Sequence, residues 1–167
     1  MEEFIEEVDW DDNVIAVHPR EKLKEKVFPH RASLIIPITP EGKLILCKRA
    51  KDKHPYPNTW CCAVGGKVLA GETYEQAAMR EMKEEVGLTA DLQFVAPFSY
   101  KEEDYPAIFH IFTTTQHIRK ELFNLDPTEI QYAEEFTREE VRQLMTEQPA
   151  QFAPTFCRAL EVFLKRY

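Results

Sequence analysis

Short runs of apolar residues separated by polar turns make up much of the chain, and they predict strands. Two such runs, Phe4–Trp10 and Val14–His18, flank the polar residues 11–13 and predict a hairpin at the start of the sequence. Pro19 then suits an early position of a short helix that extends to about Lys26. The first thirty residues are therefore expected to fold as a hairpin followed by a short helix.

The middle of the chain continues this strand pattern. Residues 31–38 and 43–48 predict two strands joined by a turn at residues 39–42. Residues 49–60 are charged and contain Pro55 and Pro57, so they predict a loop. A short strand at residues 61–64 is expected to lead into Gly65 and Gly66. Two further strands are expected at residues 92–99 and 106–114.

Residues 73–87 give the clearest helix signal. Thr73 and Gln76 form a capping-box pattern, and Gly87 suits the position just after the helix. Between them Met79, Met82 and Val86 recur at helical spacing and predict the face that packs on the core. Two more helices are expected at residues 137–146 and 154–166. Strands and helices mix along the chain, so we expect an α/β (α+β) fold with a mixed sheet between helices.

Length and composition are consistent with one compact domain. The chain has 167 residues, of which 44% are hydrophobic, and we expect a single domain over residues 1–167 with an N-terminal hairpin extension over about 1–30. The formal net charge of −8 argues against nucleic acid as the main partner, because phosphate neutralisation needs a basic face. An acidic protein binds an anionic substrate only where a cation and a few placed basic groups invert the local field.

Compartment and redox state follow from similar observations. No apolar run approaches the roughly 20 residues of a membrane span. The first twelve residues are acidic and lack the features of a signal peptide, so we expect a cytoplasmic protein without a membrane partner. In that compartment the four cysteines are expected to be free thiols. Cys61 and Cys62 could suggest redox chemistry, but small strand residues near the core are the simpler interpretation.

Three carboxylates gather on one side of the clearest helix. At about 100° per residue, Glu81, Glu84 and Glu85 fall within one arc of roughly 100°. Like charges at this spacing repel one another unless a cation lies among them. Hard oxygen ligands of this kind suit Mg²⁺ or Mn²⁺. The alternative is a solvated acidic face, on which Arg80 and Lys83 pair with neighbouring carboxylates.

The wider spacing favours the metal-binding interpretation. Residues 66–88 read GKVLAGETYEQAAMREMKEEVGL and resemble the Nudix box, G-x5-E-x7-R-E-U-x-E-E-x-G-U. Every fixed position matches: Gly66, Glu72, Arg80, Glu81, Met82, Glu84, Glu85, Gly87 and Leu88. Such a match occurs by chance on the order of 10⁻⁸ per window at average residue usage. The chain therefore resembles the Nudix hydrolases, and this resemblance implies an α/β/α sandwich.

The resemblance also implies an activity and a set of site residues. Nudix hydrolases cleave a diphosphate linkage with the help of divalent cations. By this resemblance Glu81, Glu84 and Glu85 are metal ligands, and the backbone carbonyl of Gly65 or Gly66 is a further ligand. Arg80 orients the glutamates, and Glu72 anchors the preceding loop. The general base is left open between a glutamate of the box, such as Glu84 or Glu85, and Glu129 outside it.

The flanking segments resemble the branch that contains isopentenyl-diphosphate isomerase. The shared features are His30-Arg31-Ala32 before a strand, the basic segment 48–53, and Tyr56-Pro57-Asn58-Thr59-Trp60. In the isomerase an Arg and a Lys four residues apart bind the substrate diphosphate, and Arg49 and Lys53 match that spacing. They are therefore candidate substrate-binding residues.

Two alternatives to hydrolysis stay open. The first is the isomerase reaction, but the catalytic Cys of the isomerase aligns with Gly65 and its His with Lys67. His30 is then either a relic of a metal ligand or a hydrogen-bonded structural residue. The second alternative is a nucleotide-binding module without catalysis. Such a module does not need three clustered carboxylates, whose mutual repulsion is destabilising without a cation. The expected partner is a small-molecule diphosphate whose second half is undetermined, and homodimerisation, which is common in the family, stays open.

Overall fold

The computed structural model describes residues 1–167 and contains three sheets, three α-helices and three short 3₁₀ helices. The strands are β1 Phe4–Val8, β2 Val14–Pro19, β3 His30–Ile35, β4 Leu44–Arg49, β5 Trp60–Cys62, β6 Val64–Lys67, β7 Leu92–Tyr100, β8 Ala107–Thr114 and β9 Ile130–Phe136. The α-helices are α1 Tyr74–Val86, α2 Arg138–Glu147 and α3 Pro154–Arg166, and the 3₁₀ helices are η1 Arg20–Lys24, η2 Lys120–Leu122 and η3 Pro149–Gln151.

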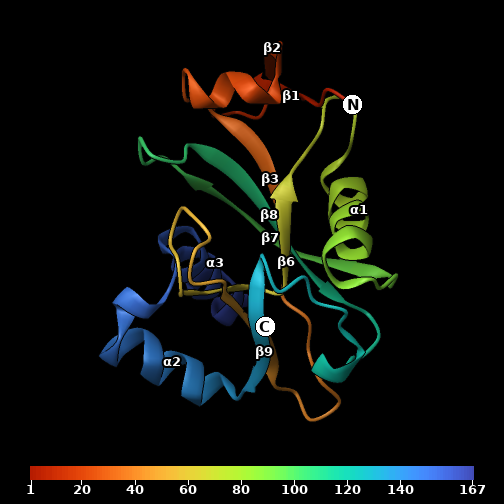
Figure 1. Ribbon diagram of the computed structural model, residues 1–167, viewed down its shortest axis with the longest axis vertical. Helices are drawn as coiled ribbons and strands as arrows, with labels where there is room; N and C mark the ends of the chain where they lie inside the picture. The colour runs from red at the N-terminus through yellow and green to blue at the C-terminus, as the bar shows by residue number, and fades with distance from the viewer.

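The larger sheet is mixed and separates two layers of helices. Its strand order is β6-β3-β8-β7, in which β3 and β8 run parallel and the other neighbours run antiparallel. One hydrophobic cluster lies between this sheet and α3, and a second one lies beneath α1. Figure 1 shows α1 beside β6, with α3 on the other side of the strands. The expected α/β/α arrangement around a mixed sheet is therefore confirmed.

Strand pairing differs from the local expectation in two places. The strands predicted at residues 31–38 and 43–48 do not form one hairpin ladder, because β3 pairs with β6 and β8 whereas β4 pairs with β5 and β9 in a separate three-stranded sheet. Gly65 and Gly66 do not follow a strand but lie inside β6, opposite Leu34 and Ser33. Pairing partners distant in sequence decided both points, and no local pattern reveals them.

The N-terminal segment folds close to its expected boundaries. The predicted hairpin forms as β1 and β2, and the predicted short helix is the 3₁₀ helix η1. Arg31 on β3 holds the hairpin in place through its contacts with Glu6 at 2.8 Å and Asp12 at 2.6 Å. None of the helices has the length and apolar character that a membrane crossing requires. All four cysteines are free thiols, and Cys47 is buried between strands.

Candidate active site

Helix α1 carries the acidic cluster, and its ends form as the sequence predicts. The Thr73 hydroxyl accepts a hydrogen bond from the Gln76 amide at 3.1 Å, and the Thr73 amide donates to the Gln76 side chain at 2.9 Å. Gly87 ends the helix with a φ of +72°, a left-handed conformation that glycine adopts without a steric penalty. These caps fix which residues of α1 face the sheet.

The prediction of the buried face of α1 was wrong at one residue, Met79. Met82 and Val86 are 1% exposed and pack on the sheet, but Met79 is 42% exposed. Ala78 takes its place in the core, because the helix turns a small residue toward the strands where they approach closely. The rotation that turns Met79 outward also turns Glu81 inward, so that Glu81 is only 9% exposed and lies against β6.

Strand β6 is shaped around Glu81. A Cβ added to Gly66 would lie 2.2 Å from the carboxyl carbon and one carboxyl oxygen of Glu81. Only a glycine leaves that space, so the missing side chain of Gly66 is what admits the carboxylate beside the strand. Burial raises the pKa of Glu81, although its contact with Arg80 works in the opposite direction.

Arg80 holds the acidic groups together from one side. Its guanidinium contacts both oxygens of Glu72, at 2.7 and 3.0 Å, and donates to the backbone carbonyl of Lys67 at 3.0 Å. It also contacts one oxygen of Glu81 at 2.7 Å and one oxygen of Glu84 at 3.4 Å. Glu72 in turn accepts a hydrogen bond from the backbone amide of Leu69 at 2.9 Å, which ties the loop before α1 to the same network.

Glu85 lies at the solvent-exposed side of the cluster, next to β6. Its carboxylate accepts a hydrogen bond from the Gly65 amide at 3.1 Å. Burial raises the pKa of Glu85 to about 8, and the negative charges of Glu81, Glu129 and Glu84 add to this rise. The carboxylates therefore lie near enough to feel one another, which is the condition that a bound cation relieves.

The loop at residues 50–59 brings a basic group next to Glu129, whose negative charge acts on Glu85. Lys53 pairs with Glu129 at 2.6 Å. Arg49 donates through Nε and Nη2 to the loop carbonyls of Tyr56 at 3.2 Å and Pro55 at 2.7 Å. Its Nη1 has no protein partner among the hydrogen bonds of the chain. Arg49 thus shapes the loop and keeps one donor free.

The donor chemistry of this cluster fits a hard divalent cation. Glu81, Glu84 and Glu85 each use one carboxyl oxygen toward Arg80 or Gly65 and leave the other without a protein partner. In this arrangement no three His, Cys, Asp or Glu side chains already surround one point at ligand distance. Rotation of the glutamate side chains is needed to bring the free oxygens together, and long carboxylate side chains can make that change.

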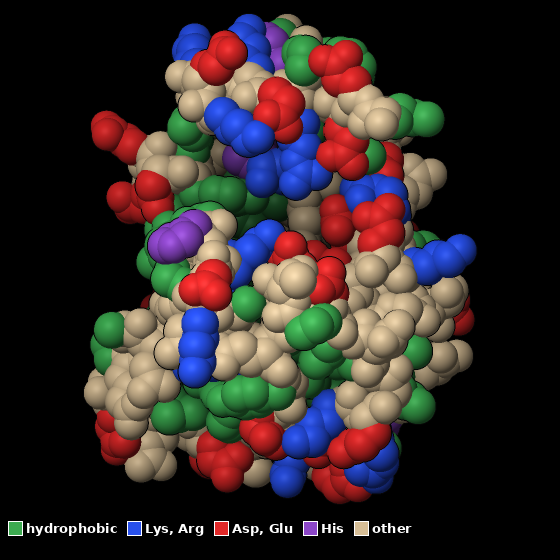
Figure 2. All heavy atoms as spheres, viewed as in Figure 1, with side chains coloured by type: hydrophobic (Ala, Val, Ile, Leu, Met, Phe, Trp, Pro, Cys, Tyr) green, Lys and Arg blue, Asp and Glu red, His purple; other side chains and the backbone are tan.

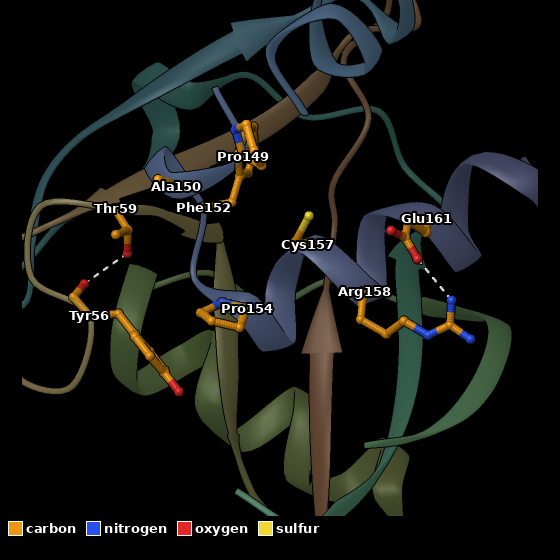
Figure 3. A pocket seen from close by; sticks show the side chains of 9 residues that line it. All are labelled: Tyr56, Thr59, Pro149, Ala150, Phe152, Pro154, Cys157, Arg158 and Glu161. Atoms are coloured by element: carbon orange, nitrogen blue, oxygen red, sulfur yellow. Dashed lines mark hydrogen bonds and ion pairs between the residues drawn. The ribbon is translucent and has the colours of Figure 1, made fainter. Parts of the chain in front are cut away.

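A hollow elsewhere on the protein lacks this chemistry. It measures about 450 Å³ and lies between the loop and the start of α3, lined among others by Tyr56, Phe152 and Cys157 (Figure 3). Its one basic side chain, Arg158, is paired with Glu161 at 2.8 Å. None of the residues of the acidic cluster lines it, so this hollow is not the candidate active site.

Sequence reasoning did not identify every polar residue near the cluster. Tyr105, in the turn between β7 and β8, contacts Lys67 on β6, and Tyr56 donates a hydrogen bond to Asp104 in the same turn. No local signal marks these residues, because the turn reaches the site only through the pairing of β8 with β3.

The chain is similar to known proteins over most of its length. Residues 28–156 match the NUDIX domain family. A prenyl-diphosphate phosphatase from Methanosarcina mazei is 31% identical over 157 residues, which cover 90% of this chain and 89% of that protein. An isopentenyl-diphosphate Δ-isomerase from Serratia proteamaculans is 34% identical over 101 residues, covering 60% of this chain and 56% of that protein.

The fold agrees as well. The crystal structure of a Deinococcus radiodurans protein superposes with a TM-score of 0.79 and 23% identity over 99% of both chains. The resemblance inferred from residues 66–88 and their flanks is thus confirmed by the match over residues 28–156 and by relatives on both the hydrolytic and the isomerase side. This chain belongs to the Nudix hydrolase family of enzymes.

Proposed function

We propose that the protein is a metal-dependent hydrolase that cleaves a diphosphate linkage in a small anionic substrate. The observation that carries this proposal is the placement of Glu81, Glu84 and Glu85 around a glycine-lined strand, with Arg80 holding one side of the cluster. A solvated acidic face does not require a glutamate that is only 9% exposed and lies against a strand glycine, as Glu81 does. The prenyl-diphosphate phosphatase relative supports the diphosphate chemistry.

In this proposal Glu81, Glu84 and Glu85 would hold Mg²⁺ or Mn²⁺, with the backbone carbonyl of Gly65 or Gly66 as a further ligand. When bound, the cation would offset the charge of the diphosphate and so favour attack of water on phosphorus. Arg80 keeps the glutamates in position through its hydrogen bonds and does not contact the substrate.

The proton of the attacking water goes to Glu129 or to one of the box glutamates, Glu84 or Glu85. Glu129 contributes to the raised pKa of Glu85, which places its charge near that carboxylate, and Glu129 is paired with Lys53. Lys53 and the free Nη1 of Arg49 are the groups that we assign to the substrate phosphates. When Lys53 turns to a phosphate, it leaves Glu129 unpaired and free to accept a proton.

One observation favours isomerisation as a second candidate. Gly65 has no thiol, but the Cys62 sulfur lies 2.7 Å from the position of a Cβ on Gly65, so a thiol is present in that region after all. Burial raises the pKa of Cys62 well above its usual value, so this thiol stays protonated. The complete set of box glutamates nevertheless favours hydrolysis, and Cys62→Ser separates the two activities.

The test is a screen of diphosphate compounds for product formation with Mg²⁺, with Mn²⁺ and with chelator, with dimethylallyl diphosphate formation assayed in parallel. Hydrolysis should need the metal, and Glu85→Gln should reduce it by orders of magnitude while the fold is retained. Glu75→Gln is the matched control, because Glu75 is exposed on the first turn of the same helix. Metal-independent turnover would refute the proposal; isomerised product would support the second candidate, and tight nucleotide binding without turnover would support a non-catalytic module.

A further inference from the structure

One buried polar atom of the protein lacks a hydrogen-bond partner. His30 is 2% exposed, and its Nδ1 lies 3.0 Å from the backbone carbonyl of Phe28. Its Nε2 is buried and is the only buried side-chain nitrogen or oxygen of the chain without a partner. Buried polar groups in folded proteins are almost always paired, so an orphaned one requires an explanation.

The contacts of His30 define what its free nitrogen can do. A carbonyl oxygen only accepts hydrogen bonds, so Nδ1 carries the proton and donates to Phe28. The ring is neutral, since a buried imidazolium has no carboxylate beside it to pair with. Nε2 therefore presents a lone pair, and its missing partner must be a hydrogen-bond donor or a metal ion.

The neighbours of His30 exclude a metal ion at this position. His30 and Ala32 lie on the same face of β3, and Lys67 of β6 is paired with Ala32, so its side chain belongs to that face as well. The Tyr105 ring packs on the His30 ring with centroids 5.0 Å apart, and Lys67 donates to the Tyr105 hydroxyl at 3.2 Å. Lys67 has no carboxylate partner, so its positive charge stays next to His30 and repels a cation.

A hydroxyl group fits these neighbours better than an anion does. A phosphate oxygen would satisfy Lys67 but has no proton for Nε2 of His30. A hydroxyl group donates its proton to Nε2 and accepts from Lys67 or from the Tyr105 hydroxyl at the same time. The cluster of His30, Lys67 and Tyr105 is thus built for a group that donates and accepts at once.

The cluster lies beside the acidic site along β6, on the other face of that edge strand. Lys67 follows Gly66 directly, so its side chain points away from the face on which Glu81 lies, while its backbone carbonyl accepts a hydrogen bond from Arg80. Figure 2 shows the surface hollowed below the N-terminal hairpin, with basic side chains above the hollow and acidic ones at its side. Because β6 is the edge strand of its sheet, a substrate whose diphosphate binds at the glutamates can extend its organic part around this strand toward Lys67 and Tyr105.

From these observations we propose that His30, Lys67 and Tyr105 form a polar subsite for a hydroxyl group on the organic part of the substrate. This inference rests on the proposed function and extends it to substrate choice. Tyr105 covers His30 from an exposed turn, so its side chain must move aside when the substrate enters. A site that binds a hydroxyl group discriminates against a compound without one, because His30 is then left unpaired again. The enzyme accordingly selects nucleoside or sugar diphosphates over diphosphates with a hydrocarbon chain.

The experiment compares kcat/KM for ADP-ribose and other nucleoside diphosphate compounds with kcat/KM for geranyl diphosphate, in the presence of Mg²⁺. The wild-type protein should favour the best hydroxylated compound, and His30→Phe should lower that preference at least about tenfold. Tyr105→Phe, which keeps the half-buried ring and removes only the hydroxyl, should lower it in the same direction. His110→Phe is the matched control, because His110 stacks on Tyr74 on the opposite face of the sheet, and it should leave the preference unchanged.

A binding measurement separates this inference from the proposed function. The nitrogen NMR resonance of His30 Nε2 should shift when a methylene-bridged ADP-ribose analogue binds, and should stay in place with the methylene-bridged geranyl compound. Hydrolysis with an unchanged preference in His30→Phe, or geranyl diphosphate as the best substrate, would overturn the subsite while the hydrolase assignment stands. An unmoved Nε2 resonance with bound ADP-ribose analogue would show that His30 holds only water. Metal-dependent hydrolysis of none of the compounds would refute the proposed function and the subsite with it.

Discussion

Replacement of Gly66 by alanine tests whether the missing side chain on β6 is what admits Glu81. The new Cβ would lie 2.2 Å from the Glu81 carboxyl group, whereas carbon atoms in contact are separated by about 3.5–4.0 Å. The Glu81 side chain must therefore move by more than about 1 Å to restore an ordinary contact distance. It cannot do so and keep its 2.7 Å contact with Arg80.

The magnitude follows from three contributions. Loss of a hydrogen bond between charged groups costs about 1.5–3 kcal/mol, and overpacking costs about 1–3 kcal/mol where the site cannot relax. Replacement of glycine by alanine stabilises the folded state by about 0.4–1 kcal/mol, because it reduces the conformational entropy of the unfolded chain. We expect Gly66→Ala to lower the free energy of unfolding by about 1.5–5.5 kcal/mol and to weaken metal-dependent activity, because a proposed metal ligand is displaced.

The assay is a double-mutant cycle with Glu81→Ala, measured by urea unfolding. In the Glu81→Ala background no carboxylate occupies the space, so Gly66→Ala should be neutral or slightly stabilising there. The coupling energy between the two positions should then be about 2.5–6 kcal/mol, the sum of the lost contact and the overpacking, which exceeds the usual error of additivity. An equal cost of Gly66→Ala in both backgrounds would refute the reasoning, since the clash would then lie elsewhere in β6.

Three further predictions follow from single contacts. Thr73→Ala should lower the free energy of unfolding by about 1 kcal/mol through loss of the capping box of α1, as measured by urea unfolding, and an unchanged midpoint would contradict that role. Arg49→Lys should disorder the loop at residues 50–59, because lysine cannot donate to the Tyr56 and Pro55 carbonyls together. Amide hydrogen exchange at residues 50–59 should become faster, and unaltered exchange would show that Arg49 does not stabilise the loop. Burial lowers the pKa of His30 from 6.5 to about 4, so on acidification the unfolded chain binds a proton at this residue before the folded chain does. The free energy of unfolding should therefore fall by about 3 kcal/mol between pH 6.5 and pH 4. If a His30→Phe variant lost the same free energy of unfolding over this pH range, His30 would be ruled out as the cause.

Several features of this protein follow from local sequence alone. The boundaries of α1 follow from Thr73, Gln76 and Gly87, since capping and left-handed backbone are properties of one or two residues. The position of the carboxylates on one arc of that helix follows from helical geometry. The family follows from the spacing of residues 66–88, and the match over residues 28–156 agrees with it.

Other features depend on contacts between residues distant in sequence, and only the folded chain decides them. Met79 matches the helical stripe yet faces solvent, because the sheet leaves room for Ala78 and not for a longer side chain at the contact. Gly66 lies inside β6 because the strand pairs with β3. The meeting of His30, Lys67 and Tyr105 requires β6, β3 and β8 to lie side by side. Local patterns indicate backbone preferences and the periodicity of buried positions. Which strands become neighbours depends on the free energy of the whole packed core, and no short segment of sequence determines it.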